Sequence, residues 1–146
     1  MKYYLSLNPV ESYAEALAVA LIRNECCRWM THNDKPLNVE QQIRFYRRLI
    51  RSEKLRLFLL RIEPDGAPCG YALIKKTGRY KAWLTGGIAT SFRGKGFGRF
   101  VFQTLIGLCD SRQKWLEVLR TNRRAIALYK RLGFVVRKTT REIYIM

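Results

Sequence analysis

The sequence has little histidine, few acidic residues and no paired cysteine motif, and each shortage excludes a class of protein. The one histidine, His32, cannot form a histidine-rich metal site, and we expect no metal. The four cysteines form no C-x-x-C pair, and the adjacent Cys26 and Cys27 are poor disulfide partners for each other. We therefore expect reduced, structural cysteines in a cytoplasmic protein.

Long apolar runs are also missing. No run approaches the length of a membrane span, and the first residues, "MKYYLSLNPVES", show no signal-peptide pattern. Of the 146 residues, 48% are hydrophobic and 12% aromatic, which suffices for a core without metals or disulfides. We expect one globular domain over residues 1–146, with no membrane partner.

The shortage of acidic residues leaves a large positive charge. Lys and Arg number 28 against 11 Asp and Glu, a net charge of +17. This excess predicts an anionic partner, which could be a nucleic acid, a phosphorylated cofactor, an anionic substrate or an acidic protein. A basic surface that serves only solubility is the alternative. The cations are spread from Arg44 to Arg141, so they do not locate a groove.

Capping patterns and apolar periodicity predict four helices. Ser12 with Glu15 and Asn38 with Gln41 have the capping-box spacing. A third helix is expected to begin near Phe97, and a fourth to run from an N-cap at Asn122 to a left-handed C-cap at Gly133. The apolar face expected for the second helix consists of Val39, Ile43, Tyr46 and Ile50.

Short apolar segments between these helices predict the strands. They are "YYLSL", "LRLFLLRI", "GYALIKK", "KAWLTGGIAT", "WLEVL", "FVVRK" and "EIYIM". The order is β-α-α-β-β-β-α-β-α-β-β. This order predicts an α/β domain whose central sheet is mixed, largely antiparallel, of about seven strands, and flanked by about four helices.

The stretch "GGIATSFRGKGFGRF", Gly86 to Phe100, combines glycines with cations between a strand and a helix. Free N–H groups and the positive end of the helix dipole collect at such a helix start, and glycine lets an anion approach the backbone. The spacing fits neither the dinucleotide pattern GxGxxG nor the P-loop GxxxxGK[ST]. It fits RxxGxG, as Arg93, Gly96 and Gly98. A glycine-rich turn without a ligand is the alternative.

A second stretch, "NRRAIALYKRLGF", runs from Asn122 to Phe134. Together the two stretches resemble the GCN5-related N-acetyltransferase (GNAT) family. "IATSFRGKGFG" is similar to the family's acetyl-CoA pyrophosphate motif, and "LEVLRTNRRAIALYKRLGF" is similar to its later motif. The expected order of strands and helices also matches the family over nearly the full length.

The resemblance implies acetyl-CoA as co-substrate. Backbone N–H groups from Arg93 to Arg99 would hold the pyrophosphate, and Gly87 to Ala89 would pair with the pantetheine arm. The strand would splay from its neighbour at a bulge, for which Gly86-Gly87 is a suitable sequence. The cofactor-binding residues so implied are Gly87, Ile88, Ala89, Arg93, Gly94, Lys95, Gly96, Phe97, Gly98, Arg99, Asn122, Ala125 and Tyr129.

The resemblance also implies direct acetyl transfer, without an acyl-enzyme. The N–H of Ile88 would stabilise the oxyanion, and Tyr129 would protonate the departing thiolate. The alternative for Tyr129 is a core position with a satisfied hydroxyl. A base must take a proton from the amine. Glu117 is one candidate, and the others are His32 and Asp34.

The alternatives for the acceptor side are ordinary structural roles. Glu117 could be a strand carboxylate paired to an arginine, and His32 and Asp34 could be polar loop residues. Trp29 and Trp83 are candidates for the wall of the acceptor pocket, although core packing is the favoured interpretation for each.

The acceptor itself stays open among three hypotheses. The first is an N-acetyltransferase of a small, anionic or nucleotide-linked amine. The second is an acetyltransferase of a macromolecular amine, on a protein N-terminus, a lysine or an aminoacyl-tRNA. The third is a non-enzymatic nucleic-acid-binding module, which lacks a stacking platform and a recognition helix. The charge favours an anionic acceptor; a nucleic-acid partner is not favoured but stays open, as does a homodimer.

Overall fold

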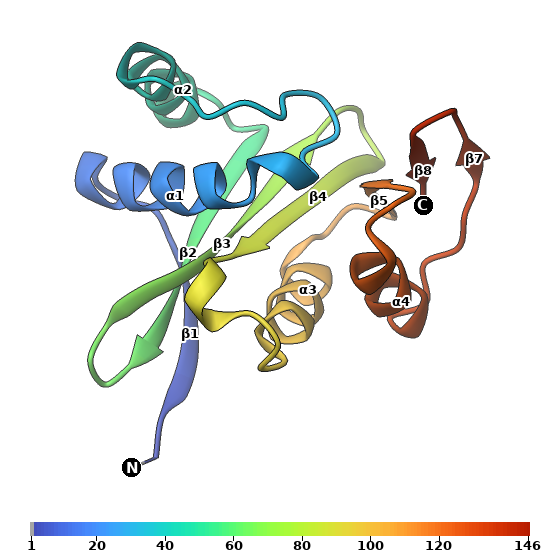
Figure 1. Ribbon diagram of the computed structural model, residues 1–146. Helices are drawn as coiled ribbons and strands as arrows, with labels where there is room; N and C mark the ends of the chain where they lie inside the picture. The colour runs from blue at the N-terminus through green and yellow to red at the C-terminus, as the bar shows by residue number, and fades with distance from the viewer. Residues whose placement is uncertain (1) are drawn as a thin grey trace.

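The computed structural model describes residues 2–146 as strands and helices in one layered arrangement (Figure 1). Two single-turn 3-10 helices, η1 and η2, accompany the regular elements. In chain order the elements are β1 (Tyr4–Pro9), α1 (Tyr13–Glu25), η1 (Cys27–Trp29), α2 (Val39–Arg51), β2 (Leu55–Glu63), β3 (Ala67–Lys76), β4 (Lys81–Ile88), η2 (Thr90–Phe92), α3 (Phe97–Leu108), β5 (Gln113–Trp115), β6 (Glu117–Leu119), α4 (Arg123–Arg131), β7 (Lys138–Thr139) and β8 (Ile143–Ile145).

The strands form two sheets that meet side by side. The larger has the order β1-β2-β3-β4-β5, and only its β4–β5 pair is parallel. The smaller has the order β6-β8-β7 and is antiparallel. The mixed, largely antiparallel α/β architecture predicted from the sequence is thereby confirmed.

The larger sheet is covered on both faces, which explains its continuous apolar strands. Leu57, Leu59 and Tyr71 pack with α1 on one face. Alternate positions such as Leu60 and Ile74 pack with α3 and α4 on the other. Figure 1 shows the same division, with α1 lying across one side of the strands and α3 on the opposite side.

The predicted helix caps are all present. The Ser12 hydroxyl accepts from the Glu15 N–H, and Asn38 and Gln41 form a reciprocal capping box. Asn122 accepts from the Ala125 N–H, and Gly133 has φ of +98°. No helix in residues 2–146 has the length and apolarity that crossing a membrane would need.

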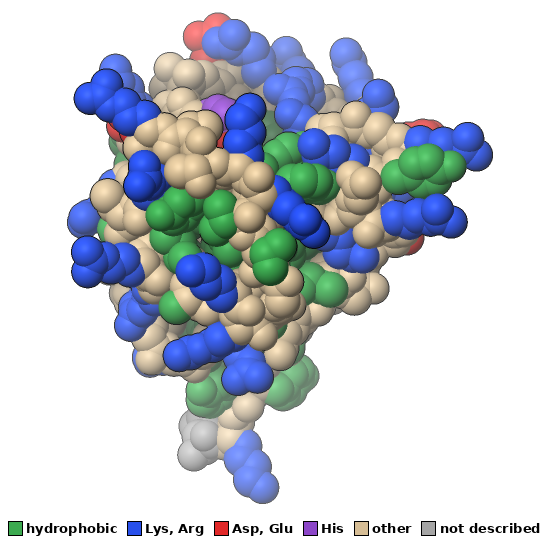
Figure 2. Space-filling model, turned by 90° about the vertical axis from the view of Figure 1, so that its right-hand side faces the viewer, with side chains coloured by type: hydrophobic (Ala, Val, Ile, Leu, Met, Phe, Trp, Pro, Cys, Tyr) green, Lys and Arg blue, Asp and Glu red, His purple; other side chains and the backbone are tan. Residues whose placement is uncertain are grey.

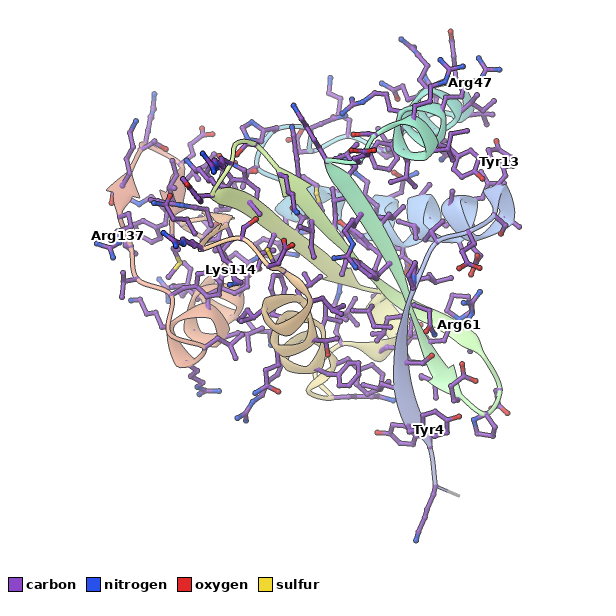
Figure 3. The ribbon with its side chains drawn as sticks, turned by 180° about the vertical axis from the view of Figure 1, so that it is seen from behind. Tyr4, Tyr13, Arg47, Arg61, Lys114 and Arg137 are labelled. Atoms are coloured by element: carbon purple, nitrogen blue, oxygen red, sulfur yellow. The ribbon has the colours of Figure 1, made fainter. Side chains whose placement is uncertain are left out.

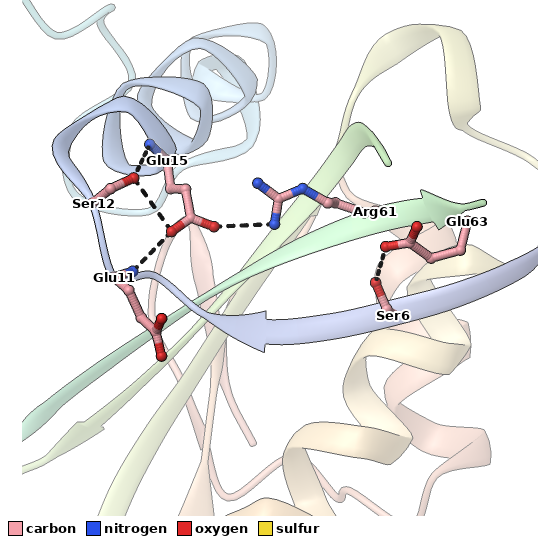
Figure 4. A network of polar contacts seen from close by, with 6 residues as sticks. All are labelled: Ser6, Glu11, Ser12, Glu15, Arg61 and Glu63. Atoms are coloured by element: carbon pink, nitrogen blue, oxygen red, sulfur yellow. Dashed lines mark hydrogen bonds and ion pairs between the residues drawn. The ribbon is translucent and has the colours of Figure 1, made fainter. Parts of the chain in front are cut away.

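The start of α1 is also tied to the sheet (Figure 4). One Glu15 carboxylate oxygen accepts from the Glu11 N–H, and the other lies 3.0 Å from the Arg61 guanidinium on β2. On the neighbouring strand, the Ser6 hydroxyl donates to Glu63 at 3.0 Å. These contacts fix how α1 leaves β1 and crosses the sheet.

The segment "WLEVL" differs from its predicted single strand. β5 ends at Trp115, and Leu116 exchanges both backbone hydrogen bonds with Met146, at 2.8 and 2.9 Å. The chain therefore leaves β4 and joins the smaller sheet in the middle of one apolar run. Of the predicted strand "FVVRK", only Lys138 lies in β7, which pairs with β8 through Lys138 and Thr139.

The buried face of α2 differs from the predicted one as well. Val39 and Ile50 are exposed, while Phe45 and Leu49 pack against the core. The predicted stripe was thus rotated about the helix axis. Arg47, an exposed residue of α2, points away from the sheet in Figure 3.

Candidate active site

A cavity of about 1250 Å³ lies where the two sheets part. Its walls come from the loop after α1, the strands β3, β4 and β6, the turn before α3, and the helices α3 and α4. The pairing of β4 with β5 ends at Trp83 and Trp115, while β4 continues to Ile88. The cavity therefore opens along an unpaired edge of β4.

Backbone pairing shows which β4 groups reach this edge. The Thr77 N–H donates to the Lys81 carbonyl, and the Ala89 N–H donates to the Cys69 carbonyl. Since alternate residues of an antiparallel strand bond the same neighbour, the odd-numbered residues of β4 bond to β3. The N–H groups of Gly86 and Ile88 consequently point to the other side, and both residues line the cavity.

The expected bulge at Gly86-Gly87 is not there, which corrects that expectation. The β3–β4 register runs unbroken from Gly70–Ile88 to Lys76–Ala82. The strands part because the chain after Trp115 changes partner, so no bulge is needed. Gly87 has a different role, because a Cβ there would lie 2.7 Å from Tyr71 Cε1 and 3.0 Å from Cys26 Sγ.

The glycine turn faces the same cavity. Gly94 and Gly96 have φ of +78° and +82°, and Gly96 is the N-cap of α3 without a side chain to cap it. A Cβ at Gly98 would meet only Leu128 Cδ2, at 3.5 Å, which is ordinary contact. Packing within residues 2–146 therefore does not require glycine there. Glycine at a helix start leaves the first N–H groups open to an approaching anion.

The cations of this turn differ in what they contact. The Arg93 guanidinium donates to the Ile88 carbonyl at 3.0 Å, to the Glu25 carbonyl at 3.2 Å and to Cys26 Sγ at 3.3 Å. It thus joins the end of α1 to the end of β4. Lys95 and Arg99 are exposed, and Lys95 does not line the cavity.

Tyr129 lies on α4 with its ring in the core and is 9% exposed. The Phe102 and Phe134 rings pack edge-to-face against it, with centroids 4.9 and 6.2 Å away. Burial raises the pKa of Tyr129 well above that of an ordinary tyrosine, so the hydroxyl keeps its proton. Tyr129 also lines the cavity, so it packs in the core and borders the site, and its role as proton donor stays a prediction.

The acceptor candidates cluster on the α1 side of the cavity. Glu117 Oε2 accepts from the Thr31 hydroxyl at 3.0 Å and lies 2.5 Å from His32 Nε2. The Glu117 side chain is 21% exposed and that of His32 79%, so the carboxylate is sheltered and the imidazole faces solvent. The alternative role for Glu117 is pairing with an arginine, and its partners are instead Thr31 and His32.

Most of the residues singled out in the sequence line this one cavity. They are Trp29, His32, Trp83, Gly87, Ile88, Arg93, Gly94, Gly96, Phe97, Gly98, Arg99, Glu117, Asn122, Ala125 and Tyr129. Ala89, Lys95 and Asp34 do not line it; Ala89 is buried and the other two are exposed.

Several lining residues were not predicted as site residues from the sequence, among them Cys26, Arg28, Thr31, Lys75 and the α4 arginines Arg123, Arg124 and Arg131. Lys75 could have been found from the alternation of its strand, because Leu73, Lys75 and Thr77 share one face. Burial raises the pKa of the Cys26 thiol, which agrees with a structural cysteine.

Comparisons with known proteins agree with this geometry. The family model described as "Acetyltransferase (GNAT) family" matches residues 17–134. No curated protein gives a significant match. Among solved structures, a GNAT acetyltransferase from Streptococcus pneumoniae is 18% identical, with a TM-score of 0.76 over 98% of each chain.

Two further solved structures are similar to this chain over nearly its whole length. A spermidine N-acetyltransferase from Vibrio cholerae, in complex with CoA and spermine, is 18% identical, with a TM-score of 0.82 over 97% of this chain and 93% of that one. A candidate phosphinothricin N-acetyltransferase is 18% identical, with a TM-score of 0.82 over 97% and 96%. At this identity the likeness shows a shared fold.

Proposed function

Because this chain belongs to the acetyltransferase (GNAT) family, we propose that it moves an acetyl group from acetyl-CoA to a primary amine of a small, anionic or nucleotide-linked acceptor. One observation carries the proposal. An unpaired strand edge and a glycine-rich helix start face one cavity. The strand edge can pair with the extended arm of a ligand, and the helix start can bind its pyrophosphate.

The residues present fit acetyl-CoA. The open backbone at Gly96 to Arg99 would bind the pyrophosphate. Packing does not require glycine at position 98, but a larger side chain there would block the approach of the pyrophosphate to the backbone. The N–H of Gly86 would pair with the pantetheine amides. The arginines of α4 that line the cavity, Arg123, Arg124 and Arg131, would attract the remaining phosphate charge.

Three groups of this chain would carry out proton and charge transfer. Bound acetyl-CoA supplies an activated acetyl thioester. The Ile88 N–H faces the cavity and would stabilise negative charge that develops on the acetyl oxygen. Tyr129 would donate its proton to the departing thiolate sulfur, and Glu117 would accept the proton that the amine loses.

The charge of the cavity supports an anionic acceptor. Among the described lining residues, Glu117 is the one acidic side chain. The basic lining residues are Arg28, Lys75, Arg93, Arg99, Arg123, Arg124 and Arg131. Figure 2 shows the α4 side of the molecule, where Lys and Arg side chains surround apolar surface and acidic side chains are few.

A thermal-shift titration tests the assignment of acetyl-CoA. We expect acetyl-CoA to raise the Tm of the wild-type chain by mass action. Gly98→Leu should lose this shift, because the side chain occupies the space where the pyrophosphate meets the backbone. Gly107→Leu is the matched control at the far end of α3, where a Cβ has no atom within 4 Å. A folded Gly98→Leu protein with unchanged acetyl-CoA stabilisation would refute the assignment.

A further inference from the structure

The acceptor end of the cavity carries charge of both signs. Lys75 on β3 is directly opposite Trp83 on β4, and Trp83 is opposite Trp115 on β5. Facing residues of neighbouring strands point to the same side of a sheet. The three side chains therefore share the α1 side, where Leu73 packs against the α1 core.

Glu117 lies two residues beyond Trp115, on the same side. Its contacts with Thr31 and His32 in the loop after α1 confirm that orientation. Neighbouring strands are about 4.8 Å apart, which puts the Lys75 and Trp115 backbones roughly 10 Å from each other. Lys75 and Glu117 line one cavity, so a molecule bound there can meet both an ammonium and a carboxylate.

The two cations at this end have no acidic partner. Within residues 2–146, neither Lys75 nor Arg28 belongs to an ion pair, whereas the adjacent Lys76 on the other face binds Asp110 at 3.0 Å. Both side chains are exposed, and the Arg28 guanidinium lies 4.6 Å from the Trp29 ring centroid. Both line the cavity that Glu117 lines.

Glu117 is held in place while the cations are not neutralised. The Thr31 hydroxyl and the His32 imidazole fix the carboxylate at the cavity wall. A carboxylate so fixed suits a positively charged amine, and two cations that no carboxylate neutralises suit an acid group. The Trp29 and Trp83 side chains line the space between them.

We propose that the acceptor is a zwitterionic amine, with its amine at Glu117 and an acidic group, carboxylate or phosphonate, at Lys75 and Arg28. The inference rests on the proposed acetyltransferase function and names its substrate class. A polyamine does not fit, because this end of the cavity offers a second ammonium two cations and no second carboxylate.

Rates of acetylation with four amines test the proposal. The probes are 2-aminoethylphosphonate, aspartate, butylamine and spermidine, and acetylated product is measured by mass spectrometry. We expect kcat/KM for the better acidic amine to exceed that for butylamine by roughly tenfold or more, through KM. Spermidine should be the poorest acceptor.

Variants of Lys75 assign the preference to this site. Lys75→Glu should remove the advantage of acidic amines and raise kcat/KM for spermidine. Lys75→Gln, which removes the charge and keeps a polar side chain, should remove the advantage alone. Lys138→Glu, an exposed residue of β7 outside the cavity, makes the same change in net charge and should keep the wild-type order.

The outcomes separate the two proposals. Equal or better acetylation of spermidine by the wild type would overturn the zwitterionic acceptor and leave the acetyltransferase function intact. The same holds if both Lys75 variants keep the preference for acidic amines. Failure of acetyl-CoA to bind, with no amine acetylated, would overturn the proposed function and this inference with it.

Discussion

At the residue scale, Tyr129 combines a structural and a chemical position. Its ring is enclosed by Phe102 and Phe134, and its burial disfavours ionisation of the hydroxyl. A phenol that keeps its proton at the edge of a cavity is available to donate it to a thiolate sulfur as that sulfur departs. The aromatic packing thereby holds the donor in one place.

Tyr129→Phe separates these two contributions. We expect kcat to fall by about 10²–10⁴-fold while the affinity for acetyl-CoA stays nearly unchanged, because the ring remains and only the proton donor is lost. Steady-state kinetics with a titration of acetyl-CoA binding measures both. Tyr80→Phe, at an exposed tyrosine outside the cavity, is the control. Near wild-type kcat with lowered Tm would show that Tyr129 serves packing alone.

At the element scale, the start of α1 depends on the charge of Glu15. The Glu11 N–H and the Arg61 guanidinium lower the pKa of this carboxyl, and partial burial opposes them. A group with a lowered pKa in the folded chain stabilises it above the unfolded pKa, about 4.3 for glutamate. That stability is lost as the pH falls through the lower folded-state value.

Glu15→Gln should therefore lower the free energy of unfolding at pH 7 by on the order of 1 kcal/mol or less. The difference from the wild type should shrink as the pH falls below about 4. Urea unfolding at a series of pH values measures it. Glu53→Gln, at an exposed residue outside any ion pair in residues 2–146, is the control. A difference that persists undiminished at low pH would contradict the electrostatic explanation.

The elements that could be predicted from the sequence are those set by local rules. Ser12, Asn38 and Asn122 cap helices through residues three positions away, so their spacing suffices. The parting of β5 from β6 could not be predicted, because Leu116 changes partner inside one apolar run and periodicity carries no information on partners. The same holds for the contact of Thr31 with Glu117, whose residues are 86 positions apart.

The rotation of α2 has a further reason. Val39 and Ile50 have the spacing of an apolar face, yet this short helix buries Phe45 and Leu49 instead. Sequence periodicity did not separate two neighbouring apolar stripes on one helix. Only the position of α1 and β2 decides which stripe is covered.

At the scale of the whole molecule, two groups of cations stand out from the Lys and Arg residues that are spread along the rest of the chain. One lines the cavity, and the other is the outer stripe of α2, where Arg44, Arg47, Arg48 and Arg51 surround a hollow of about 320 Å³. Their spacing places all four on one face across two turns of helix. Within the described chain, Arg44 has a carboxylate neighbour, Glu40 at 3.8 Å, and the other three have none.

A titration with labelled tRNA tests whether the charge serves a polyanion. If it serves acetyl-CoA and a small acceptor, tRNA should bind weakly and CoA should compete with it. If α2 binds nucleic acid, log affinity should fall with log salt by roughly 0.7 to 0.9 for each phosphate contact. We expect the weak, CoA-sensitive result at both of two salt concentrations. Tight, CoA-insensitive binding that Arg47→Glu and Arg51→Glu abolish would favour a macromolecular acceptor.

The unpaired edge of β4 has a consequence for self-association of the protein. An open strand edge normally invites pairing with another chain and so promotes aggregation. Here the edge is recessed, because the loop after α1, the first turns of α3 and the helix α4 all line the same cavity. A second polypeptide would need its own strand, with neighbours, to enter that space. The edge of β4 is therefore accessible to one narrow, extended ligand and shielded from the sheet edges of other molecules.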